Sequence, residues 1–110
     1  MKVTEKDIDK IIDEANNRVD DYTYHPESVI YNIVEDITGE NICKQIETIT
    51  YQAGRWSIPV DIIFQVGDYY ICGAYSKPAT EMQEGQPTDI KFYQVYAKEV
   101  TTIEWVTEKQ

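Results

Sequence analysis

The sequence predicts an α+β fold in which two N-terminal helices pack on an antiparallel sheet of four to five strands. Two observations support this fold class. Apolar residues recur at helical spacing in two segments of the first 40 residues, and residues 57–76 alternate as a strand, a tight turn and a second strand. A chain of 110 residues without repeats or an interdomain linker is long enough for one core, so residues 1–110 are expected to form a single domain.

The central element of this prediction is a β-hairpin over residues 57–76. Every second residue from Ile58 to Val66 is apolar, which is typical of a strand with one buried face. Gly67 and Asp68 supply a two-residue turn of type I′ or II′, because glycine accepts a positive φ at the first central position. This turn fixes the register. The pairs on the apolar face are Val66 with Tyr69, Phe64 with Ile71, Ile62 with Gly73 and Val60 with Tyr75. The pairs on the other face are Gln65 with Tyr70, Ile63 with Cys72 and Asp61 with Ala74.

Two amphipathic helices precede the hairpin. Thr4 is a good N-cap for a helix from Glu5 to Asp20, and Asp7 completes an approximate capping box. Pro26 begins a second helix that runs to Thr38 and ends at Gly39. The apolar stripes consist of Ile8, Ile11, Ile12, Ala15 and Val19 in the first helix and Ile30, Ile33, Val34 and Ile37 in the second.

Further strands are expected on both sides of the hairpin. Residues Ile42–Ala53 have strand chemistry with imperfect alternation, Asp89–Ala97 is a strand, and Val100–Thr107 is a last strand with helical alternatives. Residues Ser76–Pro87 are expected to be a long loop, because two prolines and a glycine disfavour regular structure. Pro59 predicts an edge position or a bulge at the start of its strand. The predicted faces of the 89–97 strand are Ile90, Phe92 and Tyr96 on one side and Lys91, Tyr93 and Val95 on the other.

The net charge of −10 is unevenly distributed, with −7 in residues 1–40 and −3 in residues 41–110. A surface of this sign repels phosphate backbones, so direct binding to nucleic acid is disfavoured. A basic surface on another protein would attract it. The alternative is that the charge serves solubility alone. The acidic residues singled out on the outer sides of the two helices are Asp9, Asp13, Asp20, Glu35 and Asp36.

The sequence offers little for catalysis. His25 is the only histidine and directly precedes Pro26, and Cys43 and Cys72 are expected to be free thiols in a reducing compartment. Phosphate-binding glycine loops, nucleophile elbows and histidine or cysteine metal spacings do not occur in the sequence, so no cofactor or metal is expected. A small enzyme that uses Cys43 with His25, or a pair of carboxylates, stays open as an alternative.

Tyrosine is unusually abundant, with nine residues in the chain. Tyr70 and Tyr93 are predicted on strand faces opposite the apolar rows. Tyrosine is enriched at protein interfaces because it combines a large contact area with a polar tip. Exposed tyrosines beside acidic groups would form a binding surface, and the alternative is that the rings cover the second sheet face or pack under the helices.

Residues 58–99 resemble small β-rich accessory proteins encoded by phages and prophages. The resemblance rests on two strands ending near Gly73-Ala74-Tyr75, then Pro78-Ala79-Thr80, and then Glu84-Gly85-Gln86-Pro87 leading into Asp89-Ile90-Lys91-Phe92. Many proteins of this kind have no assigned activity, so the resemblance implies an origin more than a function.

Together these observations favour a non-catalytic, acidic protein-binding module. The hypothesis is a phage-encoded inhibitor of the anti-defence type, such as an anti-CRISPR, that occludes a basic nucleic-acid-binding surface of a host protein. We expect it in the bacterial cytoplasm, because the first residues lack an apolar run and no stretch approaches the roughly 20 apolar residues of a membrane span. The first alternative is a structural or homo-oligomeric subunit that associates through the tyrosine-bearing sheet face, and the second is a small enzyme.

Overall fold

A computed structural model describes residues 3–20, 23, 25–52, 57–78 and 87–97, in which two helices precede a four-stranded antiparallel sheet. The elements are α1 (Glu5–Arg18), α2 (Pro26–Thr38), β1 (Cys43–Thr50), β2 (Ser57–Val66), β3 (Tyr69–Pro78) and β4 (Thr88–Val95). The strands lie across the sheet in chain order, β1-β2-β3-β4, so each strand pairs with the next one along the chain. The predicted α+β class is confirmed.

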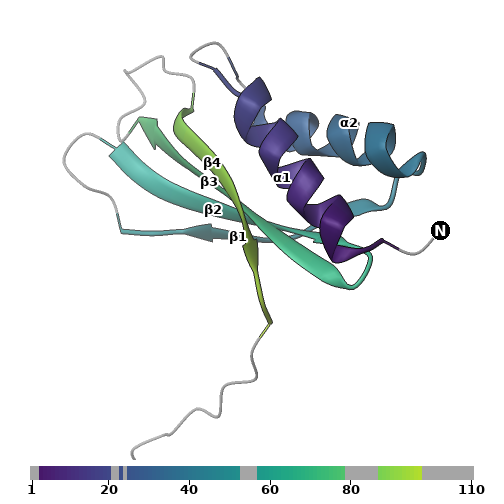
Figure 1. Cartoon of the computed structure of the whole chain (residues 1–110). Helices are drawn as coiled ribbons and strands as arrows, with labels where there is room; N and C mark the ends of the chain where they lie inside the picture. The colour runs from purple at the N-terminus through teal and green to yellow at the C-terminus, as the bar shows by residue number, and fades with distance from the viewer. Residues whose placement is uncertain (1–2, 21–22, 24, 53–56, 79–86, 98–110) are drawn as a thin grey trace, which may run out of the picture.

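Both helices lie against the same face of the sheet, where α1 contacts β3 and β4 and α2 contacts β1 (Figure 1). The core fills the space between the two layers. It combines the predicted helix stripes with alternate residues of the strands, and the rings of Phe64 and Phe92 are its largest members. The Tyr31 ring of α2 meets Phe64 edge-on, with the ring centroids 5.8 Å apart and the planes at 87°. Because both helices pack on one face of the sheet, neither of them covers the opposite face.

The hairpin forms with the predicted register. All seven predicted pairs between β2 and β3 are present, from Val66 with Tyr69 to Val60 with Tyr75. Gly67 has a φ of 62°, whereas Asp68 does not take a positive φ, so the turn is of type II′.

The helix termini follow their capping residues with one difference. The Thr4 hydroxyl accepts from the backbone N–H of Asp7 at 3.3 Å, and the Asp7 carboxylate accepts from the N–H of Thr4 at 3.0 Å. α1 ends at Arg18 instead of the expected Asp20, because Val19 is already extended. The Thr23 hydroxyl accepts from the backbone N–H of Asp20 and donates to its carboxylate, and such local bonds compete with helix. α2 ends as predicted: its last helical residue is Thr38, and Gly39 caps it with a φ of 75°.

The strand bounds also differ from the sequence expectation. β1 is shorter than Ile42–Ala53, and a bulge between Gln45 and Glu47 explains its imperfect alternation. β3 continues through Ser76 to Pro78, so the expected loop begins later, and β4 ends at Val95. Tyr96 follows that strand and is exposed instead of packing with Phe92. Residues 79–86 of the expected loop and the expected strand Val100–Thr107 lie outside the described residues.

Pro59 lies in β2, between β1 and β3, so its expected edge position is wrong. The bulge is in β1 instead. Tyr51, just beyond the end of β1, donates its N–H to the Pro59 carbonyl at 3.0 Å. Since the N and O of one residue face the same neighbour in an antiparallel ladder, the missing N–H of Pro59 faces the end of β1 and costs no bond to β3.

Asn16 links α1 to β4 through two hydrogen bonds. Its amide nitrogen donates to the Phe92 carbonyl at 3.0 Å, and its amide oxygen accepts from the Phe92 N–H at 2.8 Å. The Asn16 side chain therefore satisfies both the N–H and the C=O of Phe92, which point away from β3 at the free edge of β4.

We expect Asn16→Leu to lower the free energy of unfolding by about 1–3 kcal/mol, because it leaves the N–H and C=O of Phe92 without their partner. The measurement is urea denaturation followed by circular dichroism. Asn17→Leu is the matched control, because Asn17 is exposed on the same helix and should change stability by less than about 0.5 kcal/mol. Equal losses in the two variants would contradict the role of the Asn16 amide.

Candidate binding surfaces

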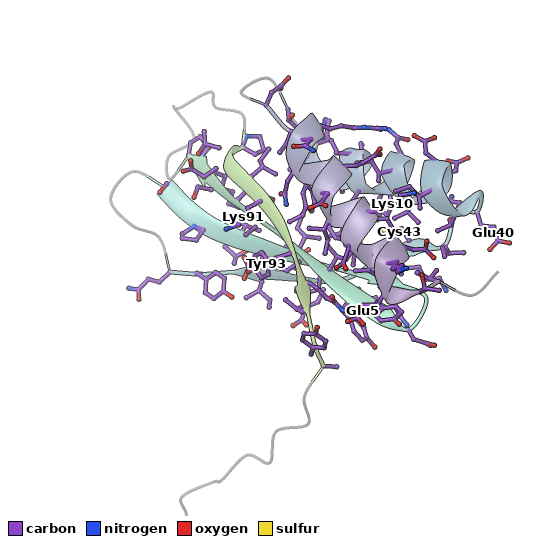
Figure 2. The ribbon with its side chains drawn as sticks, viewed as in Figure 1. Glu5, Lys10, Glu40, Cys43, Lys91 and Tyr93 are labelled. Carbon is purple, nitrogen blue, oxygen red and sulfur yellow. The ribbon has the colours of Figure 1, made fainter. Side chains whose placement is uncertain are left out.

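The two layers of the protein differ sharply in charge. The two helices together carry eight acidic and three basic residues, whereas the four strands carry three of each sign. Negative charge is therefore concentrated on the helical layer, and the sheet is balanced. Figure 2 shows where residues of the two layers lie: Glu5, Lys10 and Glu40 are on the side of the helices, and Lys91 and Tyr93 are along β4.

The five acidic residues singled out from the sequence are exposed, and they do not all share one side of the helical layer. Asn16 marks the side of α1 that faces β4, and Arg18 marks the side that faces α2. At 100° per residue, Asp9 and Asp13 fall on the Asn16 side. Asp36 lies on the α2 side, 3.5 Å from Arg18.

The remaining acids have different surroundings. Arg18 also contacts Glu14 at 3.4 Å. The side chains of Arg18, Glu14 and Asp36 are all about half exposed or more, so these ion pairs are weak and leave most of the negative potential of the helical layer in place. Glu35 lies beside Asp36 in α2. Asp20 lies in the turn after α1 and is bonded to Thr23. The acids thus form two groups on one layer.

The side of the sheet away from the helices is the second surface, and we call it the open face. Its residues alternate along each strand with those that face the helices, and one of them, Cys72, is buried among its neighbours on the sheet. They are Lys44, Glu47, Ile49, Asp61, Ile63, Gln65, Tyr70, Cys72, Ala74, Lys91, Tyr93 and Val95, together with Ile46 in the bulge of β1. No described helix or strand covers them, and Tyr93 is 39% exposed. Tyr70 and Tyr93 therefore lie on the predicted side of their strands.

The described tyrosines that contact the sheet divide between its two sides. Tyr31, Tyr69 and Tyr75 are partly buried against the core, so the alternative in which rings pack under the helices holds for them. Tyr51, at 48% exposure, joins Tyr70 and Tyr93 on the open side through its contact with Asp61.

A shallow groove of about 370 Å³ crosses the open face. Apolar side chains from all four strands line it, and Glu47 supplies the one charge among its lining residues. The apolar members include Ile46, Ile49, Ile63, Tyr70 and Val95. Ile46 belongs to the bulge of β1 and is 48% exposed, which is high for a large aliphatic side chain.

A cluster of polar side chains from β2, β3, β4 and the segment just after β1 lies on the open face beside this groove, and it centres on Asp61 and Cys72. The Tyr51 hydroxyl donates to the Asp61 carboxylate at 2.7 Å. Cys72, which lies opposite Tyr93 in the pairing of β3 with β4, interacts with both this carboxylate and the Tyr93 hydroxyl. These interactions raise the pKa of both phenols. The main cause is the hydrogen bond to Asp61 for Tyr51 and the interaction with Cys72 for Tyr93. Both tyrosines are therefore protonated at neutral pH, with Tyr51 bonded to Asp61 and Tyr93 beside Cys72.

Neither cysteine is suited to nucleophilic catalysis. Burial raises the pKa of Cys43 to about 12, and burial is also the main cause of the raised pKa of Cys72. Both thiols are therefore protonated at neutral pH, whereas attack requires the thiolate. His25 lies at the start of α2 with its Nδ1 3.3 Å from the Glu27 carboxylate, while Cys43 begins β1 after α2 has ended. The geometry does not supply the activated thiol that the cysteine version of the enzyme hypothesis needs.

The raised pKa of Cys43 predicts a loss of stability in alkali. Its usual pKa is 9.0 and its folded value is about 12, so the buried thiol contributes fully below pH 9 and loses this contribution as the pH rises toward 12. We expect the urea midpoint to fall between pH 9 and pH 11. Cys43→Ala should make this fall less steep, and an unchanged slope in that variant would contradict the assignment.

Within the described residues, no group of three or more histidine, cysteine, aspartate or glutamate side chains is placed to hold a metal ion. The helices found there are also too short or too polar for membrane crossing. Comparisons with protein-family models, curated proteins and solved structures gave no significant match to the chain.

Proposed function

We propose that this chain is a non-catalytic acidic binding module that occludes a basic, nucleic-acid-binding surface of another protein, in the manner of a phage-encoded inhibitor. The observation that supports the proposal is the separation of charge between the layers, with a net charge of −5 on the two helices and of zero on the four strands. The proposed partner is a protein of a bacterial cytoplasm.

The proposed mechanism is electrostatic and steric. Carboxylates exposed on α1 and α2 would occupy positions that phosphates take on the partner, and the rigid helical layer would block access to them. Asp9 and Asp13 present one group of these charges, and Glu35 and Asp36 present the other. Tyr70 and Tyr93 lie across the sheet from these acids, so a partner docked flat on the helical layer would leave the tyrosines free for a different contact.

The test is a quantitative pull-down from a bacterial lysate with the immobilised chain, repeated at increasing salt and with excess DNA. Binding to a basic partner should weaken steeply as salt screens the charges, and DNA should displace the partner. A captured protein that remains bound at high salt and in the presence of DNA would count against occlusion.

We expect the double variant D9K/D13K to weaken binding to the captured partner about tenfold, because it replaces attraction with repulsion at one acidic group. D13K and D68K form a matched pair of single variants with the same charge change, one on α1 and one at the exposed hairpin turn. Only D13K should weaken binding, as measured by surface plasmon resonance. Equal effects would indicate that net charge alone matters, which would remove the helical layer as the binding surface.

The open face favours a second role as well. In this role, which is the first alternative from the sequence, the chain would be a homo-oligomeric or assembly subunit that associates through the open face. The exposed apolar groove is the observation that favours this role.

A further inference from the structure

The open face combines three properties that suit contact with a copy of itself. It carries large exposed side chains, including Ile46 and Tyr93, and its groove is lined mainly by apolar residues. It belongs to the layer with balanced charge, so two such faces do not repel each other strongly. Charged side chains lie at both margins of the face, Lys44 and Glu47 on β1 and Lys91 on β4, and Glu47 is nearer than Lys44 to the height of Lys91 along the strands.

We propose that two copies of this chain form a dimer by stacking their open faces, related by a two-fold axis that lies between the sheets and runs along the strands. Sheets that stack in this way pack about 10 Å apart with their strands within about 30° of each other. An interface of this symmetry uses the same surface on both copies.

The strand order determines which residues meet across this axis. Rotation about an axis along the strands places β1 of one copy over β4 of the other and keeps the height along the strand. Glu47 pairs across the sheet with Ile63, which pairs with Cys72, which pairs with Tyr93, so Glu47 and Tyr93 lie at one height. Glu47 of each copy therefore meets Tyr93 of the other copy, and Lys91 lies on the same face two residues before Tyr93 in β4. The symmetry makes this contact twice.

The size of the face is adequate for such a dimer. Four strands about 4.8 Å apart and about eight residues long, at about 3.3 Å per residue, cover about 500 Å² in projection. Side chains standing on the sheet increase the accessible area toward the roughly 800 Å² per partner of a standard interface. The arrangement also keeps the acidic layers apart. The two helical layers lie on the outside, separated by about 30 Å, which is several Debye lengths at physiological salt.

The experiment is sedimentation equilibrium of the full chain over a concentration range from about 1 to 500 μM. The wild-type chain should shift from one to two copies in this range. E47K and K91E should each weaken the dimer about tenfold, because each places like charges across both symmetric contacts. The double variant E47K/K91E restores opposite charges and should recover most of the loss.

K10E is the matched control for K91E, since it makes the same charge change on the exposed side of α1 and should leave the dimer unchanged. Ile63→Lys, in the centre of the face, should abolish the dimer, and its circular dichroism spectrum establishes that it folds. A wild-type chain that stays monomeric at 500 μM overturns the proposal. The proposal is also overturned if the loss of dimer affinity in E47K/K91E equals the sum of the losses in the two single variants. These outcomes are independent of partner binding by the acidic layer, which D13K tests separately.

Discussion

Replacing Phe64 with alanine is expected to lower the free energy of unfolding by about 3–5 kcal/mol. Phe64 is fully buried in β2, and its ring packs edge-on against Tyr31 of α2. The variant loses the transfer free energy of the ring, leaves a cavity between the sheet and the helices, and removes an aromatic contact worth about 0.5–1.5 kcal/mol. The stability of a domain of this size is about 5–15 kcal/mol, so a loss of about 3–5 kcal/mol is a large fraction of it.

The measurement is urea denaturation at a fixed protein concentration, followed by circular dichroism. Two further variants separate the contributions. Phe64→Leu keeps an apolar side chain and should cost less than half as much as alanine, whereas Tyr31→Leu removes the aromatic contact from the other side and leaves Phe64 in place. A loss of less than about 1.5 kcal/mol for Phe64→Ala would contradict the conclusion that Phe64 is a main contact between the helical layer and the sheet.

The hairpin was predictable to the residue because two local signals agree. The alternation from Ile58 to Val66 assigns the faces, and Gly67 with Asp68 fixes the turn length, so no distant contact is needed to determine the register. The same reasoning applies to the capping box of Thr4 with Asp7 and to Gly39, whose functions depend on backbone groups within a few residues.

Features that depend on contacts distant in sequence were not predictable. Asn16 meets Phe92, which is 76 residues away, and nothing in its own segment distinguishes it from Asn17 except its position nearer the apolar stripe. The end of α1 was misplaced for a local reason instead, because the bonds between Asp20 and Thr23 compete with the last two helical residues that the sequence predicted.

The open-face surface was only partly predictable. The hairpin register places Asp61 and Cys72 on one side of the sheet, which was derivable from the turn. Tyr51 and Tyr93 join them only through the pairing of β1 with β2 and of β4 with β3. The register of β1 shifts at a bulge that alternation alone could not locate. The grouping of acids on the helical layer followed from composition, but their division into two groups required the packing of α1 against α2.

A methyl group added at Gly73 is expected to be among the most damaging small changes in the protein. A Cβ at this position in β3 would lie 2.9 Å from one ring carbon of Phe92 and 3.3 Å from one of Phe64. Both rings are buried and well packed, so neither can move away without displacing its neighbours. We expect Gly73→Ala to lower the free energy of unfolding by about 1–3 kcal/mol and Gly73→Val by more.

A double-mutant cycle identifies the cause of this loss. Phe92→Leu alone creates a cavity and destabilises the protein, but in the presence of Gly73→Ala it makes room for the new methyl group. The double variant should therefore be more stable than the sum of the two single losses predicts, by about 1 kcal/mol. Ala74→Ser, on the open face next to Gly73, is the control for a change of similar size in the same strand and should alter stability by less than about 1 kcal/mol. Strict additivity of Gly73→Ala and Phe92→Leu would show that the close approach of β3 to the Phe92 ring does not limit this core.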